Sequence, residues 1–260
     1  MTAVLYDTIG DKYRTHRAAD ARIAAALIEL MDVAAGSAIC DVGAGSGNYA
    51  NAVAAAGFRV LALEPSQVMR AQADACERIT WIGGLAEAMP LRDQCVEAAM
   101  CVLAVHHFRS LAATLREMDR VARGTIVFFT CDPRGSEPFW FHDYFPEIIA
   151  DGLRIFPRTE EFVAEAEAAT GRRGEVRAFP LPRDLRDQFM SAHWHTPEAY
   201  FDASLRANHS GFAKADPVHV ERGLAKLRAD LSSGAWDRRH GHLRVRERFD
   251  AGYRFLTFRR

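Results

Sequence analysis

Three glycines at alternate positions follow an aspartate in the stretch ICDVGAGSGNYA, residues 39–50. The apolar residues before them indicate a buried strand, and Asp41 stands near its end. Gly43, Gly45 and Gly47 permit positive φ angles and bring the backbone close to a ligand, and a helix after such a turn offers N–H groups. The pattern predicts a site for a nucleotide-type ligand. The alternative is a tight strand–helix turn that binds nothing.

Two ligands of this type, a dinucleotide and S-adenosylmethionine, are distinguished by the residues around the turn. A dinucleotide fingerprint would place a third glycine at position 48, where this chain has Asn48. Asp41 suits a cationic ligand, and S-adenosylmethionine carries an ammonium and a sulfonium. Glu64 ends the next predicted strand, where a carboxylate can accept hydrogen bonds from ribose hydroxyls. Without a ligand, Glu64 would be a surface acid at a strand end.

Strands and helices alternate over residues 37–131, which is typical of βαβ units and a parallel sheet. The strands read as continuous apolar runs, as expected when both faces are buried. The predicted strands are Ala38–Val42, Phe58–Leu63, Ile79–Ile82, Val96–Val105, Gly124–Thr130, Glu175–Phe179 and Tyr253–Phe258. The predicted helices are Ala19–Met31, Tyr49–Ala56, one that Ser66 caps and that runs to about Cys76, Leu111–Ala122 and Glu160–Ala169.

Four motifs lie in order on these elements: DVGAGSG (41–47), ALEPS (62–66), GLAEAMPL (84–91) and LAVHHF (103–108). With these motifs, residues from about 6 to 131 resemble the class I S-adenosylmethionine-dependent methyltransferases. The resemblance is to the small-molecule branch that includes the ubiquinone/menaquinone-type enzymes. It implies S-adenosylmethionine as the cofactor, S-adenosylhomocysteine as the product, and a small-molecule acceptor that is methylated at oxygen, nitrogen or carbon.

The resemblance also implies an α/β fold with a Rossmann-like, mainly parallel seven-stranded sheet, helices on both faces and an antiparallel last strand. A helical and aromatic insertion would precede that strand. We expect one methyltransferase domain over residues 1–260. Its core would comprise 1–131, 160–182 and 250–260, whereas 132–159 and 183–249 would form the acceptor pocket or a lid.

Cofactor contacts follow from the resemblance for the residues of these motifs. Those expected to hold the methionine portion are Asp41, Gly43, Ala44, Gly45 and Gly47. Those expected around the ribose and the adenine are Glu64, Pro65, Ser66, Met69, Ala86 and Glu87. Leu103 is expected in the floor under the methyl donor.

Two further positions qualify this assignment. Many relatives have an aspartate where this chain has Leu85, so the adenine amine needs another acceptor, such as Glu87 or a backbone carbonyl. In the leading segment YDTIGDKYRTHR, Tyr13 and Arg17 are expected to close over the donor's carboxylate. The alternative is a packing tyrosine and a solvated arginine.

His106 and His107 follow the fourth predicted strand, close to the expected position of the methyl group. Methyl transfer from a sulfonium depends mainly on alignment and desolvation, and a base is needed only where the acceptor is protonated. A histidine, with a reference pKa of about 6.5, can serve as that base. We favour His107 over His106; alternatively, the pair caps the strand and orients its loop.

Aromatic residues with polar tips in residues 139–145 and 191–200 are expected to wall the acceptor pocket. A surface helix with scattered aromatic residues is the alternative. No HxxxH or HExxH spacing occurs, so we predict no metal. The candidate acceptor-binding residues are Trp140, Tyr144, His193, Trp194, His195 and Tyr200.

The charge balance limits the class of partner. The chain has 33 Lys and Arg against 34 Asp and Glu, so we expect no nucleic-acid partner. Residues 171–260, however, hold 18 basic and 11 acidic residues. This excess indicates either a solvated basic surface or a segment that faces an anionic substrate group, and it keeps an RNA or protein methyltransferase as a second hypothesis. A non-catalytic or repurposed S-adenosylmethionine-binding protein is the third, because the motifs concern the donor alone.

Five cysteines without a CxxC pair indicate reduced thiols in a cytoplasmic protein. The first residues lack the apolar region of a signal peptide, and no apolar run approaches the roughly 20 residues of a membrane span. We therefore expect no membrane association. A monomer and a homodimer are equally compatible with the sequence.

Overall fold

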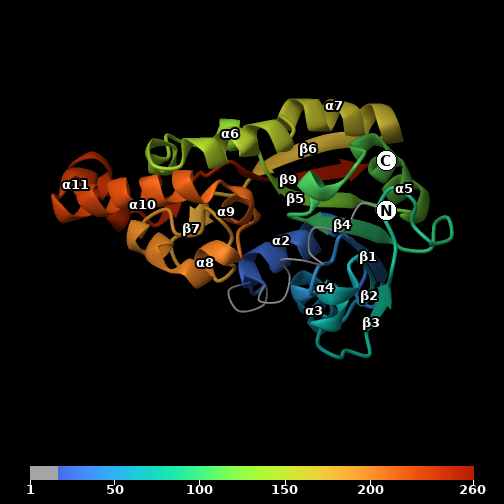
Figure 1. Ribbon diagram of the computed structural model, residues 1–260. Coiled ribbons are helices and arrows are strands. Elements are labelled where there is room, and N and C mark those ends of the chain that lie inside the picture. The colour runs from blue at the N-terminus through green and yellow to red at the C-terminus, as the bar shows by residue number, and fades with distance from the viewer. Residues whose placement is uncertain (1–16) are drawn as a thin grey trace.

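Seven strands form the main sheet in the computed structural model, which describes residues 17–260 (Figure 1). Their order is β3-β2-β1-β4-β5-β9-β6. Strands β1 to β5 run parallel, whereas β9 runs antiparallel to both β5 and β6, which confirms the predicted sheet. The bounds are β1 Ala38–Val42, β2 Arg59–Leu63, β3 Ile79–Ile82, β4 Ala98–Val102, β5 Ile126–Cys131, β6 Arg173–Ala178 and β9 Tyr253–Arg259.

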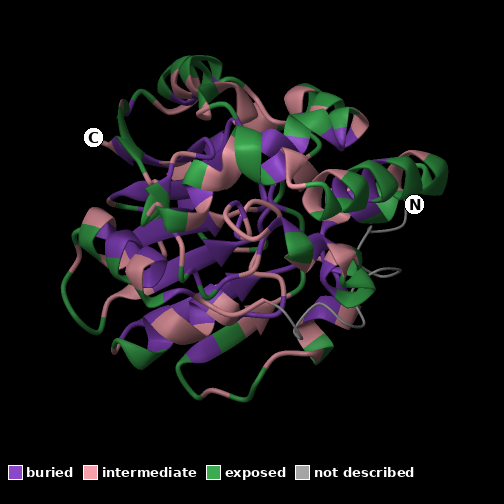
Figure 2. Ribbon diagram, turned by 90° about the vertical axis from the view of Figure 1, so that its left-hand side faces the viewer, coloured by how far each residue is buried: buried purple, intermediate pink, exposed green. Residues whose placement is uncertain are grey.

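Helices cover both faces of the sheet, because successive side chains of a strand point to opposite sides. In β5, Val127 and Phe129 join a buried cluster with α2 and α3, whereas Ile126 and Phe128 join a second cluster with α5 and α7. Figure 2 shows the strands largely buried and the outer helical faces exposed. The bounds of these helices are α2 Ala21–Met31, α3 Asn48–Ala55, α5 Leu111–Val121 and α7 Thr159–Thr170.

Side-chain oxygens cap the first turns of three core helices. Asp20 caps α2, Ser66 caps the short α4 (Gln67–Ala71), and Ser110 caps α5. The helix after Ser66 was predicted to reach Cys76, and this prediction is wrong. The backbone leaves the α-helical pattern early, since the N–H of Gln72 bonds to the carbonyl of Met69, three residues back.

The fourth strand is shorter than the predicted Val96–Val105. Strand β4 ends at Val102, because Leu103 adopts a left-handed conformation with a φ angle of 53°. The next residues form a 3₁₀ turn, Val105–His107. His106 and His107 therefore lie on this turn, one step beyond the strand.

The remaining helices belong to the segments before β6 and between β6 and β9, and α8 to α11 gather at one end of the molecule (Figure 1). Two short strands, β7 (Leu181–Pro182) and β8 (Arg248–Phe249), pair antiparallel and so join the two ends of the second segment. The helices are α6 Pro146–Ile155, α8 Ala203–Ala207, α9 Ser210–Lys214, α10 Pro217–Ser232 and α11 Ala235–His240.

Arg172, just before β6, joins three parts of the core. Its side chain is fully buried. Nε donates to Oδ1 of Asp119 in α5 at 2.7 Å, and the two terminal nitrogens donate to the carbonyls of Ala122 and Gly124, which precede β5. The guanidinium of Arg172 thus bonds to one side chain of α5 and to two carbonyls of the turn between α5 and β5.

We expect Arg172→Met to lower the free energy of unfolding by about 2–3 kcal/mol, because a half-buried acid and two carbonyls lose a buried donor. Urea denaturation followed by circular dichroism measures this change. The matched control is Arg173→Met, at the next and exposed position, which should stay within about 0.5 kcal/mol of the wild type. Equal losses in the two variants would contradict the role given to Arg172.

Candidate active site

The glycine turn lies between β1 and α3, at the carboxyl end of β1. Gly43, Gly45 and Gly47 have φ angles of 74°, 58° and 85°, which L side chains rarely adopt. A Cβ atom at position 43 would stand 2.7 Å from the Cβ of Ala104. The N–H groups of Gly43 and of the next residue both donate to the carbonyl of Leu63, at 2.9 and 3.0 Å. The end of β2 therefore holds the turn.

Two buried acids lie beside the turn: Asp41 in β1 and Glu64 just after β2. Glu64 accepts hydrogen bonds from the N–H groups of Gly45 (3.0 Å) and Ser66 (2.8 Å). Burial, and then the charge of Glu64, raises the pKa of Asp41 to about 7. A nearby cation would favour the ionised form of such a carboxyl. The turn and the acids together suit a ligand with a cationic end.

A cavity of about 560 Å³ opens over the turn, a volume typical of small-molecule sites. Gly47 and Ser66 do not line it and instead stand at the N-caps of α3 and α4. Tyr13 lies outside the described residues. The other residues expected around the cofactor line this cavity: Arg17, Asp41, Gly43, Ala44, Gly45, Glu64, Pro65, Met69, Ala86, Glu87 and Leu103.

Glu87 bonds to the backbone on the far side of this cavity. Its Oε1 accepts from the N–H of Arg109 at 2.6 Å and of Ser110 at 3.4 Å, and so holds the segment that leads into α5. Leu85, at the position where relatives have an acid, is 37 % exposed. Glu87 also lines the cavity, so Glu87 and a backbone carbonyl both stay predictions for the acceptor of the adenine amine.

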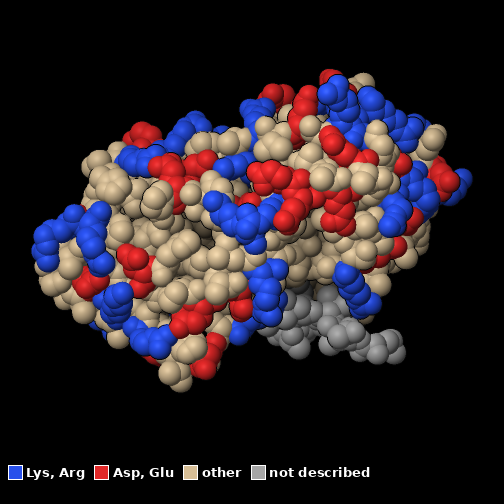
Figure 3. All heavy atoms as spheres, turned by 90° about the horizontal axis from the view of Figure 1, so that it is seen from above, with Lys and Arg blue, Asp and Glu red and all other residues tan. Residues whose placement is uncertain are grey.

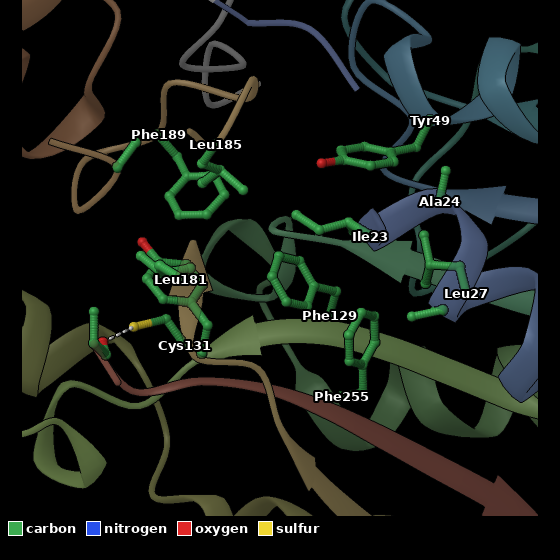
Figure 4. Close-up of a cluster of buried hydrophobic side chains, with 14 of the residues drawn as sticks. Ile23, Ala24, Leu27, Tyr49, Phe129, Cys131, Leu181, Leu185, Phe189 and Phe255 are labelled. Atoms are coloured by element: carbon green, nitrogen blue, oxygen red, sulfur yellow. Dashed lines mark hydrogen bonds between the residues drawn. The ribbon is translucent and has the colours of Figure 1, made fainter. Parts of the chain in front are cut away.

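A second cavity, of about 190 Å³, adjoins the first. Four residues line both cavities: Arg17, Leu103, His106 and Lys214. Phe189 and Cys131 line it and belong to the cluster of buried side chains drawn in Figure 4, and the thiol of Cys131 donates to the carbonyl of Ala251 at 3.7 Å. Its apolar wall includes Phe139, Ile148, Ile149, Phe156, Phe189 and Tyr253. Its polar residues include Ser136, His142, Ser191, Asn208, His209 and Ser210.

His106 stands at the junction of the two cavities, whereas His107 lines only the first. Their ring centroids are 3.8 Å apart. Burial, followed by the charges of His107, Lys214 and Arg17, lowers the pKa of His106 well below its usual value. Burial and then Lys214 lower the pKa of His107 to about 4. Both rings are therefore neutral at pH 7, and the geometry favours His106 as the one that reaches an acceptor.

None of the six residues predicted to bind the acceptor lines either cavity. Trp140, Tyr144, Trp194 and Tyr200 are buried in the hydrophobic core of the insertion. The indole of Trp140 donates to the carbonyl of Trp194 at 2.7 Å, and the hydroxyl of Tyr200 donates to the backbone. The rings of His193 and His195 pack against Tyr200 and Trp194. This arrangement does not support the expected pocket, and it assigns these side chains to packing.

Arg17 is held at the junction by an acid that the sequence did not single out. Its Nε and Nη2 donate to the two carboxylate oxygens of Asp187 at 2.5 and 3.2 Å, and the hydroxyl of Tyr49 donates to the same group at 3.0 Å. Asp187 is 1 % exposed. Nearby, Asp20 accepts from the N–H of Arg186 at 2.9 Å. The segment around 184–187 therefore packs on residues 17–22.

The sequence did not indicate Asp187 and Lys214 as site residues, because neither lies within a motif. The only sequence signal was the basic excess of residues 171–260, which we connected with an anionic substrate group. Within residues 17–260, no group of three or more His, Cys, Asp or Glu residues is arranged to hold a metal ion. No helix of this described part is long and apolar enough to cross a membrane.

Comparison with known proteins identifies related chains. A family model described as a methyltransferase domain matches residues 40–129, the span from β1 to β5. A ubiquinone/menaquinone biosynthesis C-methyltransferase from Rubrivivax gelatinosus is 30 % identical over 169 residues, 62 % of this chain and 66 % of that protein. A malonyl-[acyl-carrier protein] O-methyltransferase from Pectobacterium atrosepticum is 36 % identical over 109 residues, 40 % of this chain and 42 % of that protein. The chain thus spans less than two thirds of each of these curated relatives.

A solved structure covers far more of the chain. It comes from Anabaena variabilis, is assigned to a methyltransferase of an antibiotic biosynthesis pathway, and is 42 % identical with a TM-score of 0.91. The match covers 94 % of this chain and 98 % of that one, so the relationship includes the insertion as well as the sheet. This chain belongs to the class I S-adenosylmethionine-dependent methyltransferases.

Proposed function

We propose that this protein transfers a methyl group from S-adenosylmethionine to a compact small-molecule acceptor. The observation that carries the proposal is the junction of the two cavities at Leu103 and His106. We name the larger one, over the glycine turn, the donor cavity, and the smaller one the acceptor cavity. Transfer between two bound molecules requires that their sites meet at one point.

The donor cavity fits S-adenosylmethionine by the chemistry of its wall. Ala104 leaves no room for a Cβ at position 43, and the glycines of the turn, at positive φ angles, present bare backbone that can approach a ligand. Asp41 would hold the cationic end, and Glu64 would face the ribose hydroxyls. When bound there, the donor supplies a methyl group that is already activated on a sulfonium.

The acceptor cavity sets the size and polarity of the second substrate. Its volume of about 190 Å³ is below the roughly 300–1,000 Å³ of drug-sized sites. Aromatic and aliphatic side chains make most of its wall, so a compact and largely apolar molecule fits it best. His106, neutral at pH 7 and placed at the junction, can hold or receive a proton of the acceptor.

The charge distribution favours this proposal over an RNA or protein substrate. Figure 3 shows basic and acidic side chains interspersed over the visible face, with no continuous basic surface. Much of the basic excess of residues 171–260 is balanced by ion pairs with acids of residues 1–170, most of them at the surface. The arginines in these pairs are Arg172, Arg177, Arg222, Arg239, Arg246 and Arg260.

We expect Asp41→Asn to weaken binding of S-adenosylmethionine at least about tenfold, because a buried charge partner of the cation is lost. The wild-type affinity should rise between pH 5.5 and 7.5, as Asp41, with its pKa raised to about 7, ionises. The variant should lose this pH dependence. Isothermal titration calorimetry measures both effects.

Glu77→Gln, at an exposed position, is the matched control and should bind the donor like the wild type. Donor affinity that stays unchanged in both Asp41→Asn and Glu64→Ala would refute the donor site. Binding of NADH in place of S-adenosylmethionine would refute the whole assignment.

We expect His106→Ala to lower kcat/KM for the acceptor by about 10²-fold. His107→Ala should lower kcat/KM less than His106→Ala does, because His107 does not line the acceptor cavity. The measurement is transfer of labelled methyl groups to a panel of phenols, carboxylic acids, enols and amines. A larger loss in His107→Ala would restore His107 as the acting histidine. Donor binding without transfer to any acceptor would favour a repurposed binding protein.

A further inference from the structure

Among the charged side chains that line the acceptor cavity, one cation has no counter-ion within residues 17–260. Arg17 is paired with Asp187 at 2.5 Å, and Arg154 is paired with Asp151 at 2.9 Å. Lys214, the last residue of α9, forms no recorded ion pair with the part of the chain that the structure describes. The paired groups balance one another, so the wall carries a net positive charge at Lys214.

Two histidines of the acceptor cavity, His106 and His142, do not add to this charge. Burial is the first cause that lowers the pKa values of His106 and His142, so both are neutral at pH 7. The ammonium of Lys214 further lowers the pKa of His106, and both residues stand at the junction of the two cavities. Lys214 also lines both cavities, and it therefore stands where the methyl group must pass.

His106 contributes a second, independent observation. Its Nδ1 is buried and has no hydrogen-bond partner among the described residues. Buried polar atoms in proteins nearly always have a partner, and this one lies in the wall between the two cavities. A turn of the ring that exposes this atom to the cavities would let a polar group of a bound ligand satisfy it.

The two cavities also differ in the acids that line them. Asp41, Glu64 and Glu87 line the donor cavity, whereas Asp151, already paired with Arg154, is the one carboxylate among the described residues that line the acceptor cavity. The acids lie on the donor side of the junction and Lys214 lies at the junction itself. A cationic donor and an anionic acceptor would each face charge of the opposite sign.

We propose that the acceptor carries an acidic oxygen group, a phenol or a carboxylic acid, and binds as an anion beside Lys214 and His106. This inference rests on the proposed function and narrows its substrate class. An amine acceptor would bring a second positive charge next to Lys214 and the donor's sulfonium, and like charges at such distances repel. The apolar wall of the cavity then holds the body of the molecule.

Three probes of one ring size test the proposal: benzoate, benzamide and benzylamine, which are anionic, neutral and cationic at pH 7. Each is titrated into protein saturated with S-adenosylhomocysteine, and binding is followed by ligand-observed NMR. We expect benzoate to bind about tenfold more tightly than benzamide, as is typical of a charge-assisted contact. Benzylamine should bind no more tightly than benzamide.

Variants at Lys214 test whether its ammonium causes the preference for benzoate. Lys214→Gln should reduce the affinity for benzoate to that for benzamide, whereas Lys214→Arg should keep most of the difference. Lys226→Gln is the matched control, since Lys226 lines neither cavity and donates to the carbonyl of Asp143 at 2.8 Å. This control should leave all three affinities unchanged.

The outcomes separate this inference from the function on which it rests. If S-adenosylhomocysteine itself does not bind, the proposed function fails. If it binds but benzoate does not, or benzoate shows no preference over the other two probes, the inference alone is overturned. It is also overturned if Lys214→Gln weakens S-adenosylhomocysteine and leaves benzoate unchanged, because Lys214 would then serve the donor.

Discussion

The carbonyl oxygen of Leu63 accepts hydrogen bonds from two successive N–H groups of the glycine turn, and the donor side of the active site depends on this contact. It joins the carboxyl ends of β1 and β2, which are parallel neighbours with Val42 opposite Leu63. Asp41 and Glu64 therefore reach the same edge of the sheet. A side chain at position 43 would collide with Ala104 and separate the turn from β4. One backbone junction thus sets the position of the acids, the turn and the floor of the cavity.

The parts that the sequence predicted well are those whose partners are close in sequence. The succession of strands β1 to β5 along the chain could be predicted from the apolar runs. The glycines and acids of the turn lie within about 25 residues of one another, inside one βαβ unit. Helix starts could be identified from capping residues such as Ser66. The ends of helices and strands were harder to predict, because they depend on the backbone conformation. The residue type of Leu103 does not indicate its left-handed conformation.

The acceptor side could not be predicted in this way. Its wall combines Arg17, Leu103 and Lys214, which are separated by long stretches of chain, and only the tertiary fold brings them together. Composition also cannot distinguish an aromatic residue that lines a pocket from one that fills a core. Trp140 and Tyr200 were expected at the substrate and instead fill the core of the insertion, because large rings bury more apolar area there than a small cavity offers.

The sharing of Arg17, Leu103, His106 and Lys214 by both cavities makes donor and acceptor thermodynamically linked ligands. Each ligand that settles at this common wall changes the environment of the other, and linkage is reciprocal: the factor by which the donor alters acceptor affinity equals the factor by which the acceptor alters donor affinity. Under the proposed function, the sulfonium would lose its charge at this wall during transfer. Exchange of donor for demethylated product would then remove a positive charge beside the acceptor cavity, so the loaded and spent forms of the enzyme would differ in their affinity for an anionic molecule.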